Sequence, residues 1–228
     1  MKAIISILII SCVFSGELFS QTYNNPNVGL KSPATLDILK VDATREKTVI
    51  SLSVENRVEG GYFCADRNIY IVDSKGVRLN LRSSNGIPVC PDSYKFKKIG
   101  EKLDFVLTFP PLSAGTDWID LVEECSDNCF SMYGIILDNK LNQLIDEAFS
   151  YAEKDEPAKS MVSFIKIAEG ADFKNRGAAG LLYINIVSLA SETGNKAKAA
   201  EWYNKLNTSS IPGAARYIKF LNDQGISF

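Results

Sequence analysis

The sequence predicts an α+β protein of two domains, with an antiparallel β-sandwich at residues 33–138 and α-helical hairpins at residues 139–228. Three observations predict this class. Apolar residues recur with a period of two up to about Asp138. They recur with helical spacing after that point, and turn residues divide the first region into short strand-length segments.

The N-terminus, "MKAIISILIISCVFSGELFSQ", has one lysine, an apolar run at residues 3–14 and small residues before Gln21. This order is typical of a secretory signal peptide, here residues 1–20. The run is shorter than the roughly 20 residues of a membrane helix, so no transmembrane span is expected. Alternatively, "LIISC" is a lipoprotein box in which Cys12 carries the lipid. We therefore expect an exported protein, periplasmic, extracellular or lipid-anchored, with residues 21–32 as a linker.

The composition excludes several classes of function. The chain has no histidine, which removes Ser-His and Cys-His catalytic pairs and the commonest metal ligand. A net charge of -2 and a pI near 5.4 disfavour nucleic acid as a partner. Acidic residues alternate near one predicted strand and are more typical of surface charge than of a glycosidase pair; they are Asp117, Asp120, Glu123 and Glu124. We expect a non-catalytic protein without cofactor or metal.

The strands of the first region follow from alternation. "KTVISLSVEN" places Ile50, Leu52 and Val54 on one face, and "EKLDFVLTFP" alternates in the same way. Further strands are predicted at residues 36–43, 68–73, 77–82, 93–98, 117–123 and 129–137. Seven or eight short strands in about 105 residues are typical of an immunoglobulin-like β-sandwich.

Five helices are predicted after Asp138. The first has one apolar stripe, formed by Leu141, Leu144, Ile145, Ala148 and Ala152. The second starts at Pro157, which is favoured in a first helical turn. The third, "AAGLLYINIVSLA", is apolar nearly all round and should lie between neighbours. Gly194 ends it and Asn195 caps the fourth, while the fifth runs from Pro212 to Leu221.

A weak internal repeat relates the second and fourth helices. Aligning "KDEPAKSMVSFIKI" with "TGNKAKAAEWYNKL" places Ser160 on Ala199 at a spacing of 39 residues. Gly194, Asn195, Ala199 and Tyr203 resemble the pattern of the second helix of tetratricopeptide repeats. The resemblance covers about residues 140–224 and implies helical hairpins with a concave face for a protein partner.

A second resemblance lies in the strand region. The motifs "FPPL" at 109–112, "IDLVE" at 119–123 and "MYGI" at 132–135 resemble the β-sandwich domain of secreted proteins of Bacteroidetes-type bacteria. The resemblance covers about 35 residues. It implies a fold and an exported location, and it transfers no catalytic residue.

Four cysteines remain after residues 1–20: Cys64, Cys90, Cys125 and Cys129. An even number in an exported chain favours structural disulfides. We favour the pairs Cys64–Cys90 and Cys125–Cys129. The chain-entropy model predicts that they stabilise the fold by about 3.6 and 2 kcal/mol, respectively. Crossed pairs are the alternative. The acidic neighbours of Cys125 disfavour a thiolate and hence a redox role.

Two functional hypotheses follow. The first is an interaction or scaffold protein that binds an unknown protein through the helical domain, where a basic edge would comprise Lys196, Lys198, Lys205 and Arg216. The second is a carbohydrate-binding or adhesion module that contacts a glycan through Trp118, Tyr94 and Phe96. Because Ile119 and Leu121 should face the core, Trp118 is expected to face outward.

Overall fold

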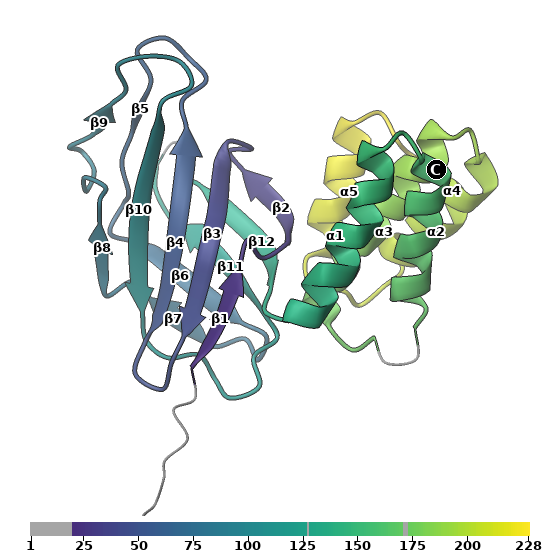
Figure 1. Cartoon of the computed structure of the whole chain (residues 1–228), viewed down its shortest axis with the longest axis horizontal. Helices are drawn as coiled ribbons and strands as arrows, with labels where there is room; N and C mark the ends of the chain where they lie inside the picture. Colours follow the sequence, from purple (N-terminus) through teal and green to yellow (C-terminus); the bar gives the residue numbers. More distant parts are fainter. Residues whose placement is uncertain (1–19, 127, 171–172) are drawn as a thin grey trace, which may run out of the picture.

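A computed structural model describes residues 20–126, 128–170 and 173–228 (Figure 1). The expected signal peptide and Cys12 lie outside the described residues, apart from Ser20. No helix within the described ranges is long and apolar enough to cross a membrane.

The prediction of an α+β chain, with antiparallel strands first and helices last, is confirmed. The described residues form twelve strands in three antiparallel sheets. The first sheet has the order β1 (Gln21–Asn24), β3 (Leu36–Ala43), β4 (Thr48–Glu55), β10 (Lys102–Phe109), β8 (Ser83–Asn85). The second has the order β2 (Val28–Ser32), β12 (Ser131–Ile136), β11 (Trp118–Glu123), β6 (Ile69–Asp73), β7 (Arg78–Asn80). A small third sheet pairs β5 (Tyr62–Phe63) with β9 (Tyr94–Lys95).

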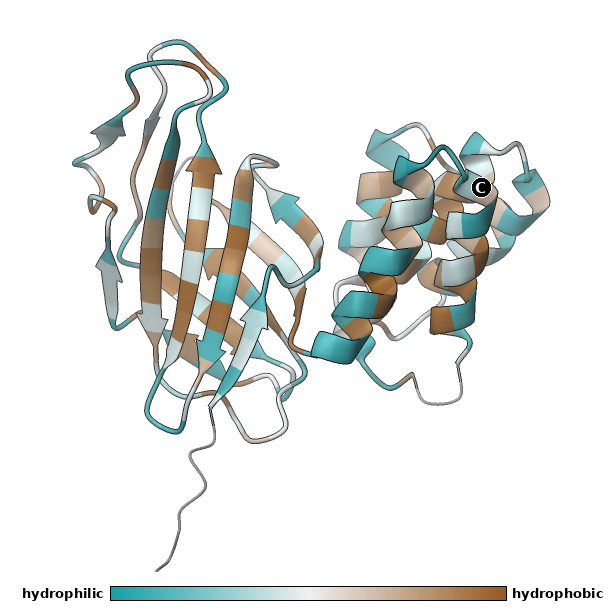
Figure 2. Ribbon diagram, viewed as in Figure 1, coloured by the Kyte–Doolittle hydropathy of each residue, from teal (hydrophilic) through white to brown (hydrophobic). Residues whose placement is uncertain are grey.

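The two larger sheets share one hydrophobic core. On β10, Leu103, Phe105 and Leu107 are buried while the residues between them are more exposed, as the alternation predicts. The same core holds Ile119 and Leu121 of the second sheet. Figure 2 shows the brown and pale bands that this alternation produces along the strands.

Residues 21–32 were expected to be a linker, and that expectation is wrong. β1 pairs with β3 at an edge of the first sheet, and β2 pairs with β12 at an edge of the second. Tyr23 is 5% exposed and belongs to the core. Both segments are short, and their strand signal is weak because edge strands bury few side chains.

Five helices follow the strands: α1 (Asn139–Glu153), α2 (Pro157–Ala168), α3 (Arg176–Glu192), α4 (Lys196–Asn207) and α5 (Ala214–Asp223). Asp138 and Asn195 cap α1 and α4 by accepting backbone N–H groups with their side chains. Gly194 adopts a left-handed conformation at the end of α3, as predicted.

The third helix is the centre of the helical half. α3 packs against α2, α4 and α5, and it also contacts β12, β2 and β11 of the second sheet. Ser160 of α2 and Ala199 of α4 are both fully buried, and the Ser160 hydroxyl donates to the carbonyl of Ala148 at 2.8 Å. The equivalent small residues of the weak repeat therefore lie at close helix contacts.

Candidate functional site

The interface between the second sheet and the helices is built around Trp118. Its side chain points away from the core between the sheets, but α3 covers it, and it is only 8% exposed. A β-carbon on Gly177 would lie 2.1 Å from Cγ of Trp118, so the indole packs directly on the helix backbone. The expectation of an exposed Trp118 is therefore wrong, because a helix fills the space where a sugar would stack.

A second aromatic residue fixes α5 at the same interface. Tyr217 is 2% exposed, and β-carbons on Gly29 of β2 and Gly180 of α3 would each lie 2.2 Å from its ring or hydroxyl group. Nearby, the Asp120 carboxylate accepts a hydrogen bond from the Gly134 backbone N–H at 2.7 Å. Burial raises the pKa of Asp120 and of Tyr217. The faces of α3 and α5 toward the second sheet are thus occupied by the protein itself.

The other two aromatic candidates also have structural roles. Phe96 is 8% exposed and contacts the ring of Tyr94 edge to face, with 5.2 Å between centroids. The Tyr94 hydroxyl donates to Glu101 at 2.6 Å, and this bond raises the pKa of Tyr94. Tyr94 lies on the small third sheet and Trp118 on the second, and Phe96 and Trp118 are both buried, so the three form no exposed stacking surface.

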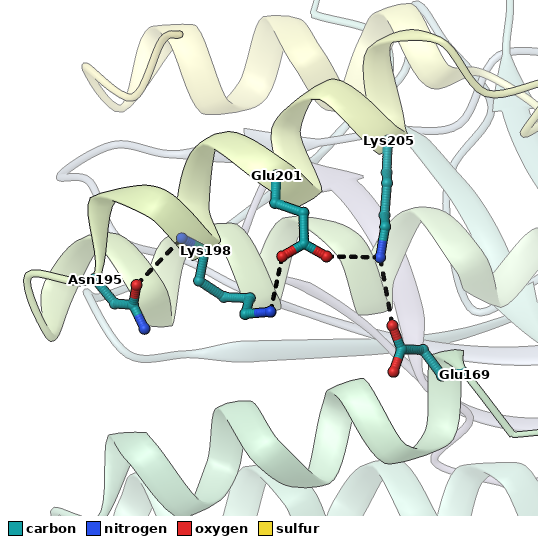
Figure 3. A network of polar contacts seen from close by, with 5 residues as sticks. All are labelled: Glu169, Asn195, Lys198, Glu201 and Lys205. Atoms are coloured by element: carbon teal, nitrogen blue, oxygen red, sulfur yellow. Dashed lines mark hydrogen bonds and ion pairs between the residues drawn. The ribbon is translucent and has the colours of Figure 1, made fainter.

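The expected basic edge is largely neutralised (Figure 3). Lys198 and Lys205 bind the two oxygens of Glu201 at 2.7 and 2.9 Å, and Lys205 also reaches Glu169 at 3.3 Å. Arg216 is not part of this edge, since its guanidinium stacks over the ring of Tyr133 at 3.9 Å. These cations stabilise the helices and their contact with the sheet.

The four cysteines form the favoured disulfides. Cys64 bonds Cys90, with 5.3 Å between the α-carbons, and Cys125 bonds Cys129, with 5.6 Å. The crossed alternative is excluded. Glu123, beside the second disulfide, is buried and accepts backbone N–H groups of Asp66 and Phe130 at 2.6 and 2.9 Å, so it organises the loops around it.

A groove lies where the helices meet the sheets, and we call it the junction groove. It comprises a cavity of about 330 Å³ and an adjoining one of about 180 Å³. The N-terminal half of α1, the C-terminal half of α2 and the described residues just before α3 form its walls. Its lining residues are Asp117, Asp138, Lys140, Leu141, Leu144, Glu147, Ser163, Lys166, Ile167, Gly170, Phe173, Lys174 and Asn175.

The floor of the junction groove is apolar. Leu144 is 42% exposed there, beside Ile167 and Phe173, which are partly buried. Asn175 holds the groove against the sheet because its side-chain amide donates to the carbonyl of Asp117 at 2.8 Å. The same side chain accepts the Ala178 N–H and so caps α3. Exposed apolar side chains in a concavity are typical of a binding surface.

The rim of the junction groove carries three lysines. Lys140, Lys166 and Lys174 line it, and none forms an ion pair with a residue that the structure describes. Three acidic residues line the same groove, Asp117, Asp138 and Glu147, and Asp138 is engaged as the cap of α1. The N-termini of α1 and α3 add partial positive charge. The three lysines therefore offer contacts for acidic groups of a ligand, beside the apolar floor.

The sequence pattern does not reveal the junction groove. The three lysines come from three separate elements, so no local motif joins them. Leu144 was assigned to the inward stripe of α1, although its side chain is substantially exposed. Leu144 lies at the edge of that stripe, next to the polar face of the helix, which could have indicated its exposure. A helical wheel does not show which other elements lie beside it.

Comparisons with models of protein families, with curated proteins and with solved structures yield no match to this chain. Within the described residues, no three His, Cys, Asp or Glu side chains gather in a way that would hold a metal ion.

Proposed function

We propose that the protein is a non-catalytic interaction module of the cell envelope that binds an acidic segment of a partner protein in the junction groove. The observation that carries this proposal is the combination of an apolar floor at Leu144 and Ile167 with three lysines on the rim. The alternative that a glycan stacks on Trp118 is not retained, since that ring is buried against α3.

The chemistry of the groove specifies the occupant. Leucine-sized side chains would lose water on contact with Leu144, Ile167 and Phe173, which favours binding by the hydrophobic effect. Carboxylates would lie beside Lys140 and Lys166, where charge pairing adds orientation and speeds association. Asp117 and Glu147 also line the groove, so the occupant's carboxylates would lie at the lysines and not across the whole surface.

The architecture of the proposed module is an immunoglobulin-like β-sandwich joined to tetratricopeptide-like hairpins. The common core of the two larger sheets supports the first part, and the equivalent burial of Ser160 and Ala199 supports the second. In this proposal the sandwich covers the inner face of α3, and the partner binds at the edge where α1 and α2 meet it. The kinship with secreted Bacteroidetes-type proteins belongs to the same proposal.

Export is a further part of the proposal. Two disulfides support it, because such bonds persist in oxidising compartments. Alkylation of protein taken directly from the envelope, without reductant, should modify no cysteine of the mature chain. Finding two or more free thiols would contradict the exported location.

The binding proposal is tested by titrating the ¹⁵N-labelled protein with a synthetic peptide of alternating glutamate and leucine. We expect amide shifts to change around Leu144, Ile167 and Phe173. The double variant Lys140→Glu/Lys166→Glu should weaken the affinity by about tenfold or more, since both reversals repel the peptide.

The matched control is Lys97→Glu/Lys98→Glu, which reverses two exposed lysines at a distant loop and should bind as the wild type does. Shifts that spread over unrelated surfaces, or equal affinity in both double variants, would overturn the proposal. Proton spectra of each variant verify that the fold is retained.

A further inference from the structure

A second exposed surface lies at the end of the strand region where the chain passes from β4 to β5 and from β9 to β10 (Figure 1). It consists of residues 55–62, which lead from β4 into β5, and residues 94–102, which lead from β9 into β10. We call it the tip. It shares no residue with the junction groove.

The tip exposes apolar side chains that the fold does not use. Val58, Tyr62 and Ile99 are 61%, 65% and 59% exposed, and with Val162 they are the four most exposed large apolar residues in the described chain. All three stand on loops or a two-residue strand at the end of the molecule. A convex end with apolar side chains is suited to insertion into a surface rather than to enclosing a ligand.

The same end is positively charged. It holds Arg57 and four lysines against Glu55, Glu59 and Glu101, so five cations minus three anions gives +2, in a chain whose total is -2. Two of the acids are engaged, because Glu55 pairs with Arg57 at 2.9 Å and Glu101 accepts from Tyr94 and from the Lys97 N–H. The lysines of the tip are Lys95, Lys97, Lys98 and Lys102.

Asn56 holds the two tip loops together. It is 5% exposed, its side-chain amide donates to the carbonyl of Lys98 at 2.9 Å, and its own carbonyl accepts the Gly100 N–H at 2.8 Å. The Phe96 N–H donates to the carbonyl of Gly61 at 3.0 Å across the same gap. Val58 and Ile99 are thus presented on joined loops, which lowers the entropy lost when they bind.

We propose that the tip binds the surface of an anionic phospholipid bilayer, with Val58, Tyr62 and Ile99 entering the interface and the lysines contacting lipid phosphates. Apolar insertion and attraction of basic residues to anionic lipids act together in peripheral binding, and one of them alone gives weak attachment. Because the tip carries lysines, an anionic lipid surface suits it better than an uncharged apolar surface. The tip and the junction groove share no residue, so attachment at the tip would leave the groove residues free of lipid contact.

The test is co-sedimentation of the mature protein with vesicles of phosphatidylcholine and phosphatidylglycerol in a 3:1 ratio, and with vesicles of phosphatidylcholine alone. Binding is expected to the anionic vesicles and to weaken with added salt. Val58→Ser/Ile99→Ser and, separately, Lys97→Glu/Lys98→Glu should each reduce the bound fraction by about fivefold or more. These side chains are exposed, so the fold should survive, and thermal melts verify it.

The matched control is Val162→Ser, which removes an equally exposed valine from α2 and should leave vesicle binding unchanged. Absence of binding to anionic vesicles would overturn the proposal, as would equal losses in Val162→Ser and Val58→Ser/Ile99→Ser. If vesicles are not bound while a cross-linker at position 62 captures an acidic protein, the tip is a protein-binding surface instead. Failure here leaves the peptide titration of the groove unaffected, since the two surfaces share no residue.

Discussion

The indole of Trp118 occupies the space that a β-carbon on Gly177 would need, which ties β11 to the first turn of α3. A few residues away, Asn175 caps α3 and donates to the carbonyl of Asp117. The strand and the helix therefore meet at fixed positions. The junction groove exists because this contact holds the start of α3 beside α1 and α2.

Gly177→Ala should destabilise the protein. A methyl group 2.1 Å from Cγ of Trp118 forces the ring or the helix to move, and overpacking of this kind costs about 1–3 kcal/mol. The better helix propensity of alanine offsets only part of this loss. Urea denaturation, followed by far-UV circular dichroism, measures the change.

The control for this prediction is the double variant Gly177→Ala/Trp118→Ala. Without the indole, the added methyl group has room, so the penalty of Gly177→Ala should largely vanish in the Trp118→Ala background. Additive effects of the two substitutions would show that the contact between these residues is not the cause.

The two disulfides should differ in their effect on stability. Replacing Cys64 and Cys90 by serine opens a loop with a sequence separation of 26, and the chain-entropy model gives a loss of about 3–4 kcal/mol. Replacing Cys125 and Cys129, with a separation of 4, should cost about 2 kcal/mol. Urea midpoints of the two serine pairs measure the order, and a larger loss for the shorter loop would contradict the entropic explanation.

Asp120→Asn should stabilise the protein at neutral pH. Burial raises the pKa of this carboxyl group above its ordinary value of 3.8, so the folded state holds the proton more tightly than the unfolded state does. The favourable contribution of this carboxyl group to the free energy of unfolding is present below its pKa in the unfolded state. It is lost as the pH rises through its pKa in the folded state. Asparagine is uncharged throughout and still offers an oxygen to the Gly134 N–H.

The measurement for this prediction is the urea midpoint of both proteins at pH 4 and pH 7. The advantage of Asp120→Asn should be present at pH 7 and shrink at pH 4, where the native carboxyl group takes up its proton. A variant that is less stable than the wild type by the same amount at both values would contradict the assignment of the penalty to the buried charge.

Much of the fold was predictable because burial imposes periodicity. β4 and β10 alternate because each strand packs on the core with one face. α3 is apolar nearly all round because it packs against neighbours on several sides. The disulfide pairs followed from loop length and the even count of cysteines. β1 and β2 were missed, since short edge strands with polar residues bury too few side chains to produce a pattern.

The sites were less predictable because they depend on which elements become neighbours. Trp118 does face away from the core of the sheets, as alternation predicts, but the sequence does not show that α3 covers it. Lys198 and Lys205 formed a basic pattern along the chain, but Glu201 of the same helix pairs with both, and Glu169 at the end of α2 reaches Lys205 as well. Lys140, Lys166 and Lys174 converge only after the helices pack.

The most direct measurement is photo-cross-linking from position 144 in the cells that make the protein. A benzophenone amino acid replaces Leu144 in the groove or, as the control, Val162, which lies on α2 outside it. We predict one cross-linked protein from position 144, joined through an acidic segment that mass spectrometry identifies, and its loss in the Lys140→Glu/Lys166→Glu background. Equal capture from position 162, a cross-linked segment without acidic residues, or capture that survives charge reversal would contradict binding in the junction groove.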